Sequence, residues 1–197
     1  AKRAVEIFSI WEQVLGKKRL VRLLSFQFDG MPDYGDELAL SFGDTRSHVD
    51  VLSIGPYFGG ELGLDAQEVA RVKKMTLDDL MRELETVSVP HAKAQILAHA
   101  AVARKYGLPM IAYEGGHHLA NYSGKEEPEV EARFNAANLD PRMGALYTSN
   151  LNNWTEAGGG LFRSVSDNDL ARMDGIADPH PPAVMDRYPG RPAGRVD

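Results

Sequence analysis

The sequence contains no cysteine, so disulfide bonds, thiolate metal sites and a cysteine nucleophile are excluded together. No apolar run approaches the roughly 18 residues of a membrane span, and we expect no membrane partner. Positive charge is scarce as well, since 22 Lys and Arg stand against 28 Asp and Glu for a net charge of −6. Without a basic stripe to neutralise phosphates, we expect no nucleic-acid partner.

What remains is the composition of an ordinary globular protein. The 197 residues are 43% hydrophobic and 25% charged, enough for one domain with a sizeable core. No signal peptide is visible, because the chain starts at Ala1 and enters an amphipathic segment at once. This start without Met leads us to expect that an upstream part has been removed.

Hydrophobic periodicity predicts alternating helices and strands. Helical patterns cover residues 4–15, 34–42, 66–74, 77–86, 90–106, 129–138 and 141–156. Apolar runs typical of buried strands cover residues 20–26, 49–54 and 108–113, with a weaker one at 161–165. Asp65 and Thr76 are predicted to cap the two helices that follow them. Trp11 falls on the apolar stripe of the first helix and is predicted to be a core residue.

Alternation of this kind predicts an α/β fold with parallel strands joined by right-handed crossovers. A doubly wound sheet usually carries a glycine-rich phosphate loop that opens a helix, and none is present. A complete (β/α)8 barrel needs about 250 residues, whereas about four strands are visible here. We therefore predict a partial (β/α)8 TIM barrel over residues 1–165, corresponding to the later half. Residues 166–197, rich in Pro, Gly and Arg, are predicted to be a poorly ordered tail.

The predicted strands carry their polar residues at their carboxyl ends, the face on which α/β proteins build sites. Glu114 directly follows an apolar strand, in the setting Tyr113-Glu-Gly-Gly, and is the main candidate for catalysis. Two glycines after it allow a substrate close to the backbone. An ordinary strand-end glutamate in a turn is the competing interpretation, and the two are about equal on these residues alone.

Other strand ends supply candidate binding residues. Tyr57 ends the second strand and is either a hydrogen-bond donor to a neighbouring carboxylate or a packed rim aromatic. Gln27 and Asp29 occupy the matching place on the first strand and suit sugar hydroxyls. Trp154, near a helix end among asparagines, suits either packing or sugar stacking.

The pair His117-His118 raises the question of a metal. Adjacent residues on an extended chain point to opposite sides, so the two are poor joint ligands. No zinc-like spacing and no His-Glu-x-x-His pattern occurs, and we expect neither a metal nor another cofactor. One of the pair is instead a candidate hydrogen-bonding partner of a substrate. A serine triad has no support either, because no Gly-x-Ser-x-Gly elbow is present.

At these residues the chain resembles the clan A glycoside hydrolases, which are (β/α)8 barrels with two catalytic glutamates. More narrowly, it is similar to bacterial proteins described as glycosidases or as cellulose-binding proteins. The matching stretches are residues 19–27, VDVLSIGPYFG at 49–59, IAYEGGHHL at 111–119, NLDPRM at 138–143, and 158–162. They span most of residues 1–165 at the spacing of strands five to eight.

The resemblance implies that Glu114 is the nucleophile of a retaining hydrolase and that Tyr57 ends strand six. Its ligand would be an oligo- or polysaccharide, and its location secreted or periplasmic. The acid/base glutamate would follow strand four, in an N-terminal half outside this chain; here only Asp29 or Glu61 is placed to replace it. A non-catalytic carbohydrate-binding or degenerate barrel module remains the alternative, and open barrel edges suggest possible self-association.

Overall fold

The computed structural model describes residues 1–28, 35 and 37–164. The predicted tail at 166–197 and the candidate residue Asp29 lie outside these residues. Over the described part the chain is α/β, with helices and short parallel strands, as the sequence predicts. None of the described helices has the length and apolarity that crossing a membrane demands.

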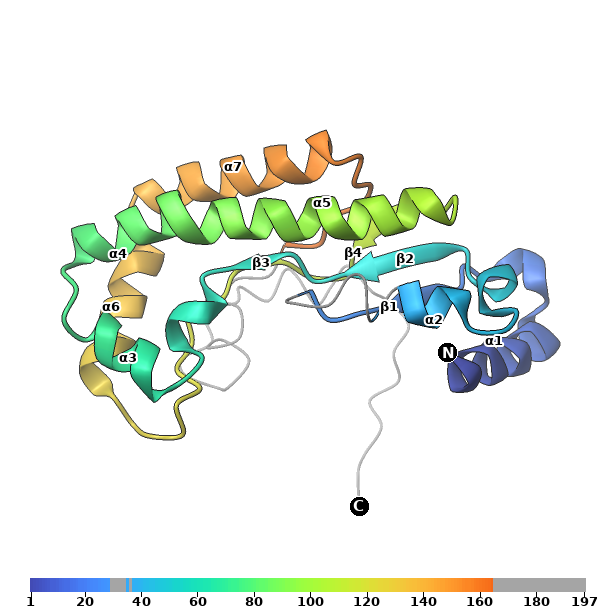
Figure 1. Cartoon of the computed structure of the whole chain (residues 1–197), viewed down its shortest axis with the longest axis horizontal. Coiled ribbons are helices and arrows are strands. Elements are labelled where there is room, and N and C mark those ends of the chain that lie inside the picture. Colours follow the sequence, from blue (N-terminus) through green and yellow to red (C-terminus); the bar gives the residue numbers. More distant parts are fainter. Residues whose placement is uncertain (29–34, 36, 165–197) are drawn as a thin grey trace, which may run out of the picture. The chain divides into compact units, whose positions relative to one another are not determined.

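Three short strands form one parallel sheet in the order β1-β2-β4 (Figure 1). They are β1 (Leu23–Ser25), β2 (Val51–Ile54) and β4 (Met110–Ala112). Every residue of β2 is buried, which is the pattern of a central strand covered on both faces. A single parallel bridge from Ala112 to Phe162 continues the order, so the predicted strand at 161–165 is reduced to one paired residue within the described chain.

A second parallel pair extends the path of the sheet. It consists of β3 (Tyr57–Phe58) and β5 (Gly116–His117), each a few residues beyond a strand of the first sheet. Directly before β5, the backbone of Gly115 passes so close to Phe162 that a Cβ on Gly115 would lie 2.7 Å from the Phe162 ring. The glycine is therefore required by the close approach of the backbone to this ring.

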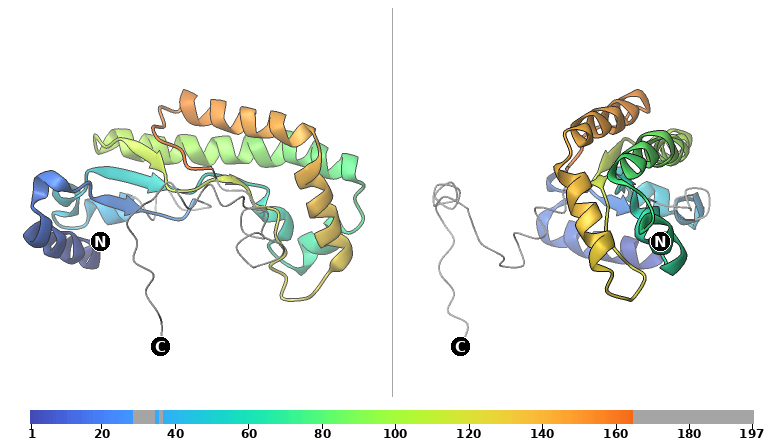
Figure 2. Two further views of the ribbon diagram at one scale, coloured as in Figure 1. Left: turned by 180° about the vertical axis from the view of Figure 1, so that it is seen from behind. Right: turned by 90° about the vertical axis from the view of Figure 1, so that its left-hand side faces the viewer.

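Seven α-helices surround these strands within the described residues. They are α1 (Lys2–Leu15), α2 (Glu37–Ser41), α3 (Ala66–Val72), α4 (Leu77–Glu83), α5 (Val89–Lys105), α6 (Pro128–Leu139) and α7 (Arg142–Glu156). Four shorter turns are η1 (Lys17–Arg19), η3 (Thr45–His48), η4 (Gly60–Gly63) and the π-helical η5 (Leu84–Ser88). Helices α5 and α7 lie side by side in both orientations (Figure 2).

Local capping signals explain where several helices begin. The Asp65 side chain accepts hydrogen bonds from two backbone N–H groups of α3, and Thr76 forms a complete capping box with Asp79. Helix α5 has Pro in its first turn, and Gly107 follows its end with φ +60°. The sequence predicted separate helices at 77–86 and 90–106, whereas the π turn η5 joins them.

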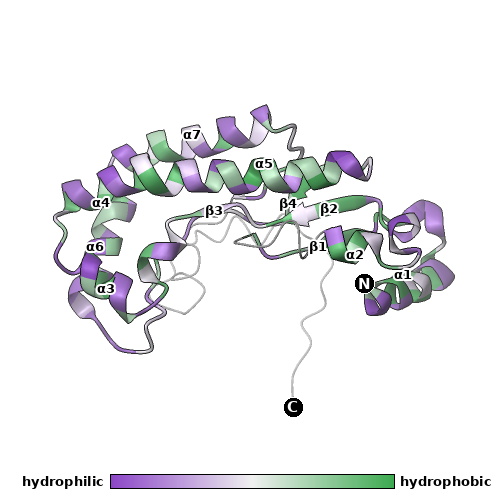
Figure 3. Cartoon of the chain, in the orientation of Figure 1, coloured by the Kyte–Doolittle hydropathy of each residue, from purple (hydrophilic) through white to green (hydrophobic). Residues whose placement is uncertain are grey.

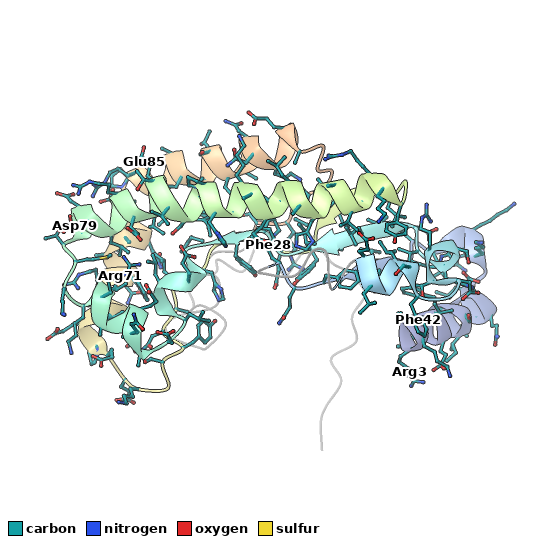
Figure 4. The ribbon with its side chains drawn as sticks, in the orientation of Figure 1. Arg3, Phe28, Phe42, Arg71, Asp79 and Glu85 are labelled. Carbon is teal, nitrogen blue, oxygen red and sulfur yellow. The ribbon has the colours of Figure 1, made fainter. Side chains whose placement is uncertain are left out.

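The hydrophobic core fills the space between the sheet and α5 and continues among α3, α4, α6 and α7. Figure 3 shows hydrophobic colours along β2 and on much of α5. Ile96 and His99 of α5 are fully buried, and the His99 ring stacks on Phe28 with centroids 5.8 Å apart. Figure 4 places Phe28 on the strand side of α5. Apolar burial of this extent is the main stabilising contribution to the domain.

The prediction for Trp11 is wrong, because its side chain is 52% exposed. Helix α1 contains no buried residue, although Ala4 and Phe8 pack partly against the core. The apolar stripe is wider than the surface it meets, so Ile7, Ile10, Trp11 and Val14 remain exposed.

A charged cluster holds α1 at the start of the strands. The buried Arg22 guanidinium donates to both carboxylate oxygens of Asp50 and to Glu12 of α1, each at 2.8–2.9 Å. The Arg22 hydrogen bond lowers the pKa of Asp50 from its usual 3.8 to about 2. Residues at this face of a parallel sheet contribute to stability more than to chemistry.

Candidate functional site

A cavity of about 400 Å³ opens at the carboxyl ends of the three sheet strands. Gln27 reaches it from the segment after β1, Tyr57 from the segment after β2, and Tyr113 with Glu114 from the segment after β4. The structure therefore brings together candidates that lie up to 87 positions apart in the sequence. Parallel strands end at the same edge of a sheet, which is why this grouping occurs.

Glu114 is half-buried at the wall of the cavity. Its neighbour Tyr113 is tied to β2 by a backbone hydrogen bond of 3.1 Å to Ile54. Burial raises the pKa of the Tyr113 hydroxyl, and the charge of Glu114 raises it further. This hydroxyl consequently keeps its proton over a wide pH range and can donate a hydrogen bond to a ligand.

Gly55 separates two tyrosine rings in the wall. A Cβ at this position would lie 3.1 Å from the Tyr113 hydroxyl oxygen and 3.3 Å from Cε2 of Tyr57. Both rings therefore approach the same backbone position from neighbouring strand ends. A larger residue here would displace at least one of the two rings.

His118 and Tyr122 complete the aromatic wall. The His118 ring lies 4.9 Å from the Tyr57 ring between centroids, and its Nε2 is 2.7 Å from the Tyr122 hydroxyl oxygen. The His118 backbone N–H donates to the Phe58 carbonyl at 2.9 Å, which anchors the loop beside β3. Polar atoms on aromatic surfaces suit a ligand with both apolar faces and hydroxyl groups.

His117 points to the other side of the chain, as the sequence predicted. It is 3% exposed, its Nδ1 lies 2.6 Å from the Tyr147 hydroxyl oxygen, and its ring packs near Phe58. The residue does not line the cavity, so only His118 of the pair is available to a ligand there. No group of three or more potential metal-ligating side chains occurs among the described residues.

Trp154 also lies away from the cavity. Its side chain is 2% exposed, its indole N–H donates to the Gly160 carbonyl at 2.8 Å, and its ring meets Phe162 edge-on. Of the two interpretations of this residue, packing agrees with the structure and sugar stacking does not.

Several further polar side chains line the cavity that the sequence did not predict as binding residues. Glu61 follows Gly59-Gly60 at a strand end, a signal comparable to that of Glu114, although the sequence indicates it only as a replacement for the missing acid. Ser88 gave no signal, because its hydroxyl donates to Glu61 across 27 positions of sequence. His91, one turn further along α5, lies exposed at the same cavity.

No protein-family model matches the chain, and neither a curated protein nor a solved structure matches it. The cavity itself is therefore the feature of the molecule that indicates a function. Its features are a half-buried carboxylate, several tyrosines and a position at parallel strand ends.

Proposed function

We propose that the cavity binds carbohydrate and that Glu114 is the nucleophile of a retaining glycosidase. The observation that carries the proposal is that Glu114 and Tyr57 line one cavity at the ends of neighbouring parallel strands. Aromatic rings give apolar surface to sugar faces, and the tyrosine hydroxyls, Gln27 and His118 supply hydrogen bonds. This lining matches the chemistry of a polyhydroxylated ligand.

We also propose a more specific fold, the later half of a (β/α)8 barrel, and the order of the strands supports it. Strands β1, β2 and β4 and the bridge at Phe162 are neighbours in the order in which they occur in the chain. A barrel is wound in this way, whereas a doubly wound sheet reverses its order at a switch point.

In the proposed reaction the Glu114 carboxylate attacks the anomeric carbon while an acid protonates the leaving oxygen. Water then releases the sugar, with the second residue acting as base. Retention requires the two carboxyl groups to be about 5–5.5 Å apart. We propose that the acid/base is supplied by an N-terminal half of the barrel, as the resemblance implies.

Replacing Glu114 with Gln in the complete protein tests this role. The amide has nearly the same shape but cannot form the glycosyl ester, so turnover should fall by at least about 1,000-fold. Glu126→Gln, an exposed change away from the cavity, is the matched control and should leave turnover unchanged. Full activity in the Glu114 variant would reject the nucleophile.

A non-catalytic carbohydrate-binding module is the second candidate. The observation in its favour is that, among the described residues, Glu61 is the only other carboxylate of the cavity, and it is held by Ser88. Calorimetric titration with β-glucan oligosaccharides measures this function directly. An absence of heat at millimolar ligand would count against it.

Self-association is proposed as well, because β1 pairs with only one strand among the described residues. An open strand edge is a template for another chain. Light scattering after size exclusion should then show a dimer or larger species, and a monomer at all concentrations would exclude it.

A further inference from the structure

The two cavity carboxylates differ from the other half-buried acidic side chains of the described chain. Glu61 and Glu114 form no ion pair with a described residue, whereas each of the others is paired with Arg or Lys. Those paired residues are Glu12, Glu37, Asp50, Glu68, Asp79, Glu83, Glu127 and Asp140. Within the described part of the chain, the half-buried carboxylates are thus compensated by a basic side chain except at Glu61 and Glu114.

The lining of the cavity cannot supply the missing positive charge. Among the described residues that line it there is no Lys and no Arg, and the only basic side chains of that set are His91 and His118. His118 is already engaged with Tyr57 and Tyr122. The two carboxylates therefore give the cavity an excess of negative charge that a cationic ligand would neutralise.

Glu61 is held in place by the fold. The turn before it contains Gly59 at φ +86°, where a Cβ would lie 2.9 Å from Leu84 of η5. At the other end of the same π turn, Ser88 is 1% exposed and donates its hydroxyl hydrogen to Oε1 of Glu61. π turns are frequent at functional sites, and this one fixes a carboxylate at the cavity wall.

The walls add a second preference for positive charge. Tyr57, Tyr113 and Tyr122 present rings to the cavity. An ammonium group over an aromatic face is attracted by the negative face of the ring, and it also forms charge-assisted hydrogen bonds with carboxylates. A neutral hydroxyl group at the same place gains less.

We propose that the cavity selects a sugar that carries a free amino group, bound as its ammonium form by Glu61 and Glu114. The inference rests on the proposed carbohydrate function and names its substrate class, an oligosaccharide of amino sugars that are not acylated. Acylation of the amine removes the charge and adds bulk, so an N-acetylated oligosaccharide is rejected.

Titration calorimetry on the whole 197-residue chain compares three tetrasaccharides at mildly acidic pH. They are the tetramer of glucosamine, the tetramer of N-acetylglucosamine, and cellotetraose. The glucosamine oligomer should bind at least about tenfold more tightly than cellotetraose, because a charge-assisted hydrogen bond exceeds a neutral one by that factor. Raising the salt from about 50 to about 500 mM should weaken only the glucosamine oligomer, since screening acts on charge. Equal affinities for the three sugars would overturn the inference.

Variants identify the residue responsible. Glu61→Gln should reduce the affinity for the glucosamine oligomer to about the affinity that the same variant has for cellotetraose. Ser88→Ala should reduce the preference in part, and Glu126→Gln should not alter it. A preference that persists in the Glu61 variant would overturn the assignment to Glu61.

The outcomes separate this inference from the proposed function. Binding of cellotetraose without any preference for the amino sugar removes the inference and leaves carbohydrate binding intact. Binding of none of the three sugars contradicts both. Spermidine that binds as tightly as the glucosamine oligomer would show recognition of amines alone and would overturn the sugar class.

Discussion

The imidazole ring of His118 packs against the phenol ring of Tyr57 with 4.9 Å between centroids. Tyr57 belongs to β3 and His118 follows β5, so the contact joins the ends of two paired strands. The ring pair forms one wall of the cavity.

Replacing His118 with Ala should weaken carbohydrate binding about tenfold, or ~1.4 kcal/mol. The substitution removes both the stacking partner of Tyr57 and the hydrogen bond to Tyr122, so the aromatic wall becomes mobile. Calorimetry measures the loss. His48→Ala, a change in η3 outside the cavity, is the control, and an unchanged affinity in the His118 variant would contradict the role.

Gly63→Ala should destabilise the domain by about 1–3 kcal/mol through overpacking. A Cβ at Gly63 would lie 1.7 Å from the Ala120 carbonyl oxygen, so the loop that carries His118 and Tyr122 must move. Thermal unfolding should show a Tm lower by several degrees. Sugar binding should weaken as well, because the displaced loop carries two residues of the cavity wall.

Gly144→Ala is the matched control for that variant and a prediction in its own right. Gly144 lies in α7 with nothing within 4 Å of an added Cβ. Alanine should raise the free energy of unfolding by about 0.5–1 kcal/mol, because glycine is a poor helix former. A lower Tm for this variant would show that α7 tolerates no side chain there.

The lowered pKa of Asp50 predicts that the free energy of unfolding decreases at acidic pH. Because hydrogen bonding to Arg22 lowers its folded-state pKa to about 2, below the usual 3.8, its contribution is complete above about pH 4. That contribution is lost as pH falls from about 4 towards 2. Asp50→Asn should therefore be less stable than the wild type at neutral pH and approach it near pH 2. Urea unfolding at several pH values measures this, with Glu131→Gln as the exposed control; a constant difference would contradict the linkage.

Much of the helical structure could be predicted from local signals. The Thr76 capping box and the proline and glycine that flank α5 act through neighbouring backbone atoms, so the sequence alone specifies them. Trp11 shows the limit of the same reasoning. Periodicity predicts that a helix has an apolar face, but it does not predict whether another element covers that face.

The grouping of Gln27, Tyr57 and Glu114 could be predicted because parallel strands end at one edge of their sheet. The bond between Glu61 and Ser88 could not, since it depends on the π turn η5 and joins residues 27 positions apart. The sequence therefore predicted the edge at which the cavity forms, and the tertiary packing determined which further side chains reach it.

The two tryptophans provide a spectroscopic test of where carbohydrate binds. Trp154 is 2% exposed and bonded to Gly160, whereas Trp11 is 52% exposed, and they are the only tryptophans in the chain. In Trp11→Phe the remaining emission should be blue-shifted and resist acrylamide quenching, because the indole ring is shielded from water. Saturating sugar should leave that emission unchanged, since Trp154 does not line the cavity. Strong quenching of Trp154 by a bound sugar would instead place the sugar against the Trp154 ring, which is not part of the cavity lining, and would contradict the site built on Glu114 and Tyr57.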